Sequence, residues 1–146
     1  MLRLALVATV LVCPLPAAAQ ATARYEMVGD AIPRPLLDFR GDVGRGRAIV
    51  VERTIGNCLI CHTVPEPNEH FMGNIGPDLK GVGSRLTAGQ IRLRMVDQTR
   101  INPASIMPPY HRTENLTRVP YRLRGRPAMT AQQIEDVVAY LSTLKD

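Results

Sequence analysis

The motif that most constrains this chain is Cys58-Leu59-Ile60-Cys61-His62, in which a histidine directly follows the second of two closely spaced cysteines. Thiols three positions apart can reach the two vinyl groups of one porphyrin and form thioethers with them. The adjacent histidine is then held beneath the iron, where it can act as an axial ligand. The motif therefore predicts one haem c, bound covalently through Cys58 and Cys61 and coordinated by His62.

Two other uses of paired cysteines suit the surrounding sequence less well. A thioredoxin-like redox pair needs a helix that begins just before the first cysteine, whereas here a helical segment precedes Cys58 and a proline-rich loop follows His62. A structural zinc site needs a closed set of four ligands. The remaining histidines, His70 and His111, do not have zinc-finger spacing, so haem attachment is the favoured interpretation.

The first 19 residues have the pattern of a secretory signal. Arg3 supplies a positive start, residues 4–15 are mostly apolar, and Ala17-Ala18-Ala19 fits the small-residue pattern before a cleavage site. A membrane anchor is the alternative, but the apolar run falls short of the roughly 20 residues that a spanning helix needs. We expect cleavage between Ala19 and Gln20 and export to the periplasm, with no membrane span.

Cleavage would change the cysteine content and the net charge of the mature chain. It removes Cys13, which leaves Cys58 and Cys61 as the only cysteines, and it removes Arg3, which lowers the formal net charge of +5 by one. The mature chain has no tryptophan, two phenylalanines and four tyrosines. Because so few aromatic side chains make a small core, a buried porphyrin would supply the missing apolar volume.

Three helices are predicted from their start signals. Asp42 can cap a helix from Val43 to about Ile55, which would end just before Cys58. Capping boxes then predict a helix from Thr87 to about residue 97 and a last helix from Thr130 to about residue 144. Gly44 and Gly46 lower the helix propensity of the first, which indicates close approach of another backbone.

The remaining segments are read as irregular. Residues 20–41 are an extended arm, and residues 63–86 and 99–129 are loops rich in proline or glycine. Such long loops are unusual in a compact domain, but they can pack on a porphyrin. The predicted organisation is a signal at residues 1–19, an N-terminal arm at 20–41 and an all-α haem domain at 42–146.

Met107 is the predicted sixth ligand of the iron. It lies in Ile106-Met107-Pro108-Pro109-Tyr110, where two prolines stiffen the loop and hold it extended. His111 is the alternative ligand, and otherwise a solvent-exposed loop histidine. A Met/His pair raises the reduction potential relative to two histidines. The other mature methionines suit the arm, the attachment segment or the helical core: Met27, Met72, Met95 and Met129.

A basic stretch separates the Met107 loop from the last helix. It contains Arg112, Arg118, Arg122, Arg124 and Arg126. These arginines form either a solvated surface, as charge runs usually do, or a docking face for an acidic partner or a haem propionate. Nothing in the sequence indicates nucleic-acid binding.

The segment Gly76-Pro77-Asp78-Leu79 resembles the Gly-Pro-x-Leu segment of class I cytochromes c. The resemblance implies a class I cytochrome c-like fold, with about three main helices and long loops around one haem. It also implies that the Pro77 carbonyl accepts a hydrogen bond from the second ring nitrogen of His62, which would orient the ring and tune the iron. An ordinary turn is the alternative.

Further blocks resemble the SoxX family across residues 25–145. They are Val28 to Pro33, Gly46 to Val50, Gly56-Asn57-Cys58, Gly76 to Leu79, Arg100 to Pro103, Met107 to Tyr110, and Met129 to Val138. The combination is far more specific than the haem motif alone.

The resemblance implies a periplasmic complex with a SoxA-like c-type cytochrome, together forming an L-cysteine S-thiosulfotransferase. That complex joins thiosulfate oxidatively to a cysteine of the SoxYZ carrier, and the sulfur chemistry belongs to the partner. This chain would contribute no catalytic residue; it would accept electrons and pass them to a soluble cytochrome. The alternative is a free-standing periplasmic shuttle that serves a respiratory oxidase.

Overall fold

The computed structural model describes residues 22–38 and 40–146, so the predicted signal, Cys13 and the cleavage site lie outside the described residues. The α-helices are α1 (Val43–Val51), α2 (Val82–Arg85), α3 (Ala88–Asp97) and α4 (Ala131–Thr143). Three short 3₁₀ turns complete the described elements: η1 (Cys58–Ile60), η2 (Gln98–Arg100) and η3 (Tyr121–Leu123). In the described ranges, extended pairing is limited to one bridge between Val28 and Ala31, and no helix is long and apolar enough to cross a membrane.

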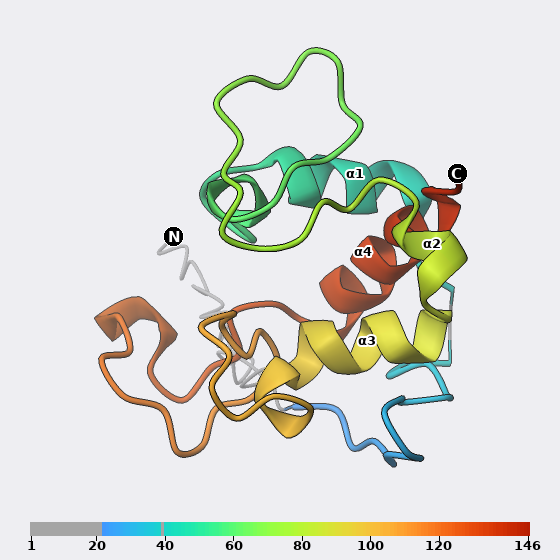
Figure 1. Ribbon diagram of the computed structural model, residues 1–146. Helices are drawn as coiled ribbons and strands as arrows, with labels where there is room; N and C mark the ends of the chain where they lie inside the picture. The colour runs from blue at the N-terminus through green and yellow to red at the C-terminus, as the bar shows by residue number, and fades with distance from the viewer. Residues whose placement is uncertain (1–21, 39) are drawn as a thin grey trace, which may run out of the picture.

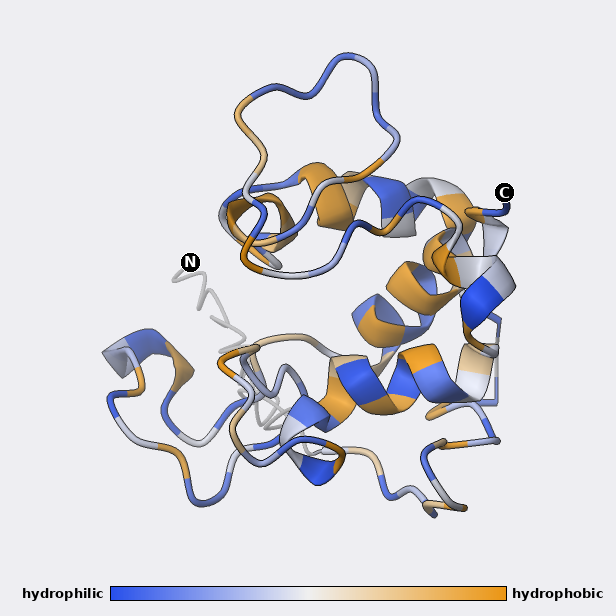
Figure 2. Ribbon diagram, viewed as in Figure 1, coloured by the Kyte–Doolittle hydropathy of each residue, from blue (hydrophilic) through white to orange (hydrophobic). Residues whose placement is uncertain are grey.

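Helix α4 is the centre of the packing. It begins at the predicted capping box of Thr130 and Gln133 and contacts α1, α2 and α3 (Figure 1). Its apolar side chains Ile134, Val137 and Val138 are buried, and Figure 2 shows hydrophobic and hydrophilic bands alternating along the helix. Each such side chain contributes roughly 1.5–3 kcal/mol when fully buried, so the amphipathic stripe holds the other helices in place.

Helix α3 also begins at its predicted capping box, Thr87 with Gln90. It is joined to α4 by a buried ion pair in which Arg92 Nε lies 2.7 Å from Glu135 Oε1. Glu135 also accepts a bond from the backbone N–H of Leu36, and Arg92 donates to the carbonyl of Ile32. Because Leu36 and Ile32 belong to the N-terminal arm, the ion pair fixes the arm as well as the two helices.

Helix α1 begins as predicted but ends earlier. Asp42 accepts a bond from the backbone N–H of Arg45 and caps the helix. The expected end near Ile55 is wrong, because Glu52 is extended and its carboxylate accepts bonds from Thr54 instead. The chain then turns through Asn57, which has a left-handed φ of 52°. This turn separates α1 from the cysteine motif.

Helix α2 was not predicted, since the sequence there reads as a loop. Its four residues depend on contacts with the end of the chain: the backbone N–H of Gly83 donates to the carbonyl of Leu144. A Cβ built on Gly83 would lie 2.5 Å from the carbonyl oxygen of Ser142. Tertiary contact, more than local propensity, therefore defines this turn of helix.

The two glycines of α1 have different roles. A Cβ on Gly46 would overlap the carbonyl of Asp136 in α4, whereas one on Gly44 meets nothing closer than Asp42 Oδ1 at 3.4 Å. The expected close approach of another backbone is thus confirmed for Gly46 and wrong for Gly44. Gly46 allows α1 to pack directly on α4.

This difference predicts opposite effects of two alanine substitutions. Gly46→Ala should lower the free energy of unfolding by about 3 kcal/mol, because α1 and α4 must separate. Gly44→Ala should raise it by about 0.5–1 kcal/mol through helix propensity. Guanidinium unfolding of the mature protein, followed by circular dichroism, measures both. Equal losses in the two variants would contradict the packing described here.

Candidate haem site

The attachment turn, residues 58–62, follows α1 closely. Its two hydrogen bonds run from the backbone N–H groups of Cys61 and His62 to the carbonyl of Cys58, at 3.1 and 2.9 Å. Leu59 is fully buried and anchors the turn in the core, while Ile60 is 53% exposed. Both thiols are half-buried and are not joined in a disulfide. The turn therefore holds two free thiols and the histidine in one short, ordered segment.

The ring of His62 is positioned by the segment after it. Its Nδ1 lies 2.7 Å from the carbonyl oxygen of Pro77, the contact that the Gly-Pro-x-Leu resemblance implies. A Cβ on Gly76 would overlap the ring, so only glycine leaves the imidazole room beside this loop. The Nδ1–H tautomer leaves Nε2 as the nitrogen with a lone pair, which is the atom that an axial ligand needs.

The surroundings of Cys58 do not suit a redox-active dithiol. Burial raises the pKa of its thiol to about 11, whereas the attacking cysteine of thiol–disulfide oxidoreductases has a lowered pKa. The turn also lacks the long helix that such motifs begin. Among the described residues, no group of three or more His, Cys, Asp or Glu side chains could hold a metal ion. The zinc interpretation thus finds no support in this part of the chain.

Met107 lies half-buried at the edge of the core, on the loop between α3 and α4. Its backbone N–H donates to Ser105 Oγ at 3.2 Å, and Ile106 beside it is 75% exposed. Of the other methionines, Met95 and Met129 are buried in the core. The thioether of Met72 accepts a bond from the backbone N–H of Val64.

His111, the alternative ligand, is not the exposed loop histidine that the sequence suggests. Only 1% of its surface is exposed. Its Nε2 accepts a bond from the backbone N–H of Ala23 in the arm, and its Nδ1 lies 2.9 Å from the carbonyl of Met129. Because both ring nitrogens are already bonded, neither is available to an iron.

Tyr110 is a site residue that the sequence did not single out. Its hydroxyl donates to the carbonyl of Gly56 at 2.7 Å, two residues before Cys58. Burial, together with the nearby thiols of Cys58 and Cys61, raises the pKa of Tyr110, so the hydroxyl stays protonated and able to donate. The bond joins the Met107 loop to the segment just before the attachment turn.

Removing this hydroxyl should weaken the fold measurably. Tyr110→Phe leaves the buried carbonyl of Gly56 without its partner, and the free energy of unfolding should fall by about 1–2 kcal/mol. Tyr121→Phe is the matched control: this ring is 84% exposed, and its loss of a hydroxyl should change stability by less than about 0.5 kcal/mol. Chemical unfolding of both variants as holoprotein tests the link, and an unchanged Tyr110→Phe protein would contradict it.

The residues present fit a haem c. Two free thiols, an oriented imidazole and a thioether from a separate loop are the donors that such a group needs. Large apolar side chains are exposed beside both the attachment turn and Met107, among them Ile60 and Ile106. Burial of such side chains against a porphyrin would be favourable.

Comparison with known protein families shows the family to which this chain belongs. The family model described as cytochrome c matches residues 43–145, and the chain therefore belongs to the cytochrome c family. The mostly helical class I cytochrome c-like fold is confirmed. None of the curated proteins matches the chain.

Comparison with solved structures shows which cytochromes this chain resembles. The crystal structure of SoxXA from P. pantotrophus contains a chain that is 31% identical, with a TM-score of 0.79. The match covers 88% of this chain and 100% of that chain. The predicted resemblance to the SoxX family is thereby confirmed, and this protein is a SoxX-like cytochrome with an electron-transfer domain.

Proposed function

We propose that this chain is the monohaem electron-accepting subunit of a periplasmic complex of the SoxAX type, an L-cysteine S-thiosulfotransferase. The observation that carries the proposal is the match to a chain of SoxXA over that chain's whole length. In this proposal a SoxA-like haem subunit joins thiosulfate to a cysteine of the SoxYZ carrier. This chain takes up the two electrons released, one at a time, and passes them to a soluble cytochrome.

Five residues would hold the haem. Cys58 and Cys61 would form the thioethers, His62 Nε2 and the Met107 thioether would be the axial ligands, and Pro77 would orient His62. When bound, the haem supplies a one-electron ferric/ferrous centre. The hydrogen bond from His62 Nδ1 to Pro77 fixes the tautomer and makes the ring a better donor.

The chain's own residues support an electron relay and leave the sulfur chemistry to the partner. Cleavage at Ala19-Gln20 would leave no cysteine beyond the two used for attachment, so no thiol remains to carry sulfur. One haem on residues 42–146 is then the sole redox centre. The arm at 20–41 and the signal at 1–19 complete the proposed organisation, with export to the periplasm.

The experiment that tests this function measures reduction of the haem. The purified holoprotein, mixed with its SoxA-like subunit and the SoxYZ carrier, should show the ferrous spectrum only after thiosulfate is added. Omission of the carrier should prevent this, because the electrons come from the coupling step. If deletion of the gene leaves thiosulfate oxidation unchanged, and the isolated protein instead reduces a respiratory oxidase without a partner, the shuttle alternative replaces the proposal.

A further inference from the structure

One long surface segment contains none of the five residues proposed to hold the haem. We name residues 112–128 the arginine excursion, because the chain leaves the core after His111 and returns at Met129 (Figure 1). Its two ends are tied together: the backbone N–H of Met129 donates to the carbonyl of Tyr110 at 2.8 Å, and His111 Nδ1 bonds the carbonyl of Met129. The excursion is therefore held firmly at its base, and Figure 2 shows it as mainly hydrophilic.

The excursion concentrates positive charge that the protein does not neutralise. It contains five arginines and one acidic residue, Glu114. Arg112 pairs with the buried Asp97 at 2.9 Å, but the other four have no carboxylate within 4.0 Å among the described residues. Arginines elsewhere, such as Arg45, Arg47 and Arg92, do have such partners. The unpaired and exposed ones are Arg118, Arg122, Arg124 and Arg126.

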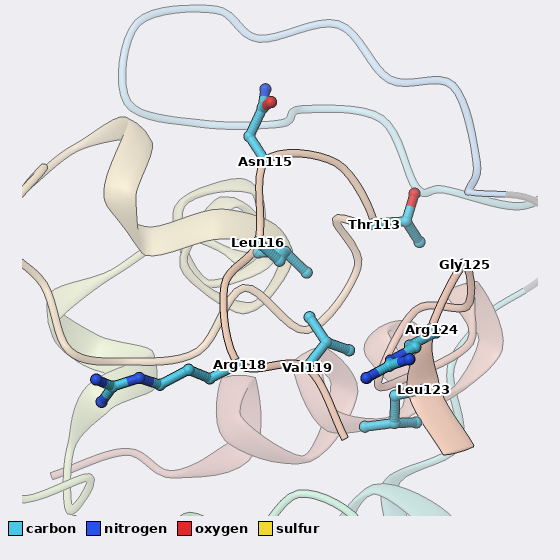
Figure 3. Close-up of a pocket in the computed structure, with 8 residues that line it drawn as sticks. All are labelled: Thr113, Asn115, Leu116, Arg118, Val119, Leu123, Arg124 and Gly125. Atoms are coloured by element: carbon cyan, nitrogen blue, oxygen red, sulfur yellow. The ribbon is translucent and has the colours of Figure 1, made fainter. Parts of the chain in front are cut away.

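The shape and composition of the excursion suit a surface that binds another protein. Tyr121 is 84% exposed, and the guanidinium of Arg124 lies 5.6 Å from its ring centroid. Tyrosine and arginine are among the side chains that most often carry binding energy at interfaces. The excursion also contains an open hollow of about 380 Å³, which Arg124 helps to line. Figure 3 shows Leu116, Val119 and Arg124 around it, with Arg118 pointing away from the other lining residues.

The base of the excursion lies next to the haem ligands. Tyr110, whose carbonyl closes the base, follows Met107 by three residues, and its hydroxyl bonds the carbonyl of Gly56 beside the attachment turn. A protein bound to the excursion would thus meet the chain on the Met107 side of the site. Electron transfer requires such proximity between two redox centres.

We propose that the arginine excursion is the docking face for the acidic redox protein that accepts electrons from this chain. The proposal rests on the electron-transfer function proposed above and adds the surface and the charge of the acceptor. Unpaired, exposed charges chiefly raise association rates and make them sensitive to salt. Stable subunit interfaces are larger and more apolar. The excursion therefore suits a transient acceptor better than a permanent subunit.

A pair of charge-matched variants tests the proposal. The excursion variant carries Arg118→Gln, Arg122→Gln and Arg124→Gln. The control carries Arg24→Gln, Arg34→Gln and Arg40→Gln, which are also exposed and lack a carboxylate within 4.0 Å among the described residues. Each variant loses three positive charges, so a general effect of net charge appears equally in both.

Stopped-flow spectroscopy measures the result. Reduced holoprotein is mixed with an oxidised acidic c-type cytochrome as the probe acceptor, at ionic strengths of about 10 mM and about 200 mM. The excursion variant should lose at least about tenfold in the second-order rate constant at low salt, and most of the difference should vanish at high salt. The control should lose no more than about threefold. Equal losses in the two variants, or no loss in the excursion variant, would overturn the proposal.

Two further measurements separate this proposal from its alternatives. The excursion variant should still co-elute with the SoxA-like subunit; loss of co-elution would place the excursion in the stable interface and overturn the docking role. Loss of binding to vesicles of anionic phospholipid, with an unchanged transfer rate, would identify a membrane ligand instead. Failure of the unmodified chain to bind any haem subunit would refute the proposed function, whereas the transfer rates report on docking alone.

Discussion

Replacing Cys58 and Cys61 by serine together should abolish covalent haem. Both thiols are free, and both lie in the ordered turn that begins with Cys58 and Leu59. Without them no thioether can form, and the protein should show no haem stain on a denaturing gel. Because the core has few aromatic residues to replace a porphyrin, we also expect the yield of folded protein to fall by about tenfold or more.

The third cysteine provides the matched control. Cys13 lies in the predicted signal, outside the described residues, so Cys13→Ser should leave haem staining and yield unchanged. Each single substitution, Cys58→Ser or Cys61→Ser, should retain one thioether and shift the pyridine haemochrome spectrum to a longer wavelength. Full haem staining in the double variant would show that the attachment site is elsewhere.

Met107→Ala should remove the proposed sixth ligand of the iron while keeping the covalent haem. The weak far-red absorption band of a thioether bound to ferric iron should disappear. The reduction potential should fall by on the order of 100 mV, because loss of the thioether favours the ferric state. Absorption spectroscopy and a redox titration of the purified holoprotein measure both effects.

Two other methionines serve as controls for this substitution. Met27 is exposed in the arm, and Met72 bonds the backbone N–H of Val64, so Met27→Ala and Met72→Ala should keep the far-red band. Persistence of the band in Met107→Ala would refute the assignment of Met107. Loss of the far-red band in Met72→Ala alone would instead assign the sixth ligand to Met72, in the loop after the attachment turn.

The elements that could be predicted from the sequence depend on local hydrogen bonds. The capping boxes at Thr87 and Thr130 and the cap at Asp42 each join residues three positions apart. Such patterns appear directly in the order of residues. The cysteine motif is local in the same sense, so the order of residues alone predicts an attachment segment at Cys58 to His62.

The features that were missed or misplaced depend on contacts between distant residues. His111 is buried because it bonds Ala23, 88 positions away, and Tyr110 bonds Gly56 across 54 positions. The short helix α2 likewise depends on the end of the chain. The early end of α1 has a local cause, since Glu52 bonds Thr54 in competition with the helix, but helix propensity alone does not reveal it.

The most direct test of the proposed function is a pull-down of the tagged chain from host cells grown on thiosulfate, followed by haem staining of the captured proteins. We expect one additional, larger haem-stained band in a stable one-to-one complex, and a further sample from cells lacking that partner should yield the chain alone. Recovery of the chain only as a monomer, from cells that are actively oxidising thiosulfate, would contradict its assignment as a subunit of a SoxAX-type complex.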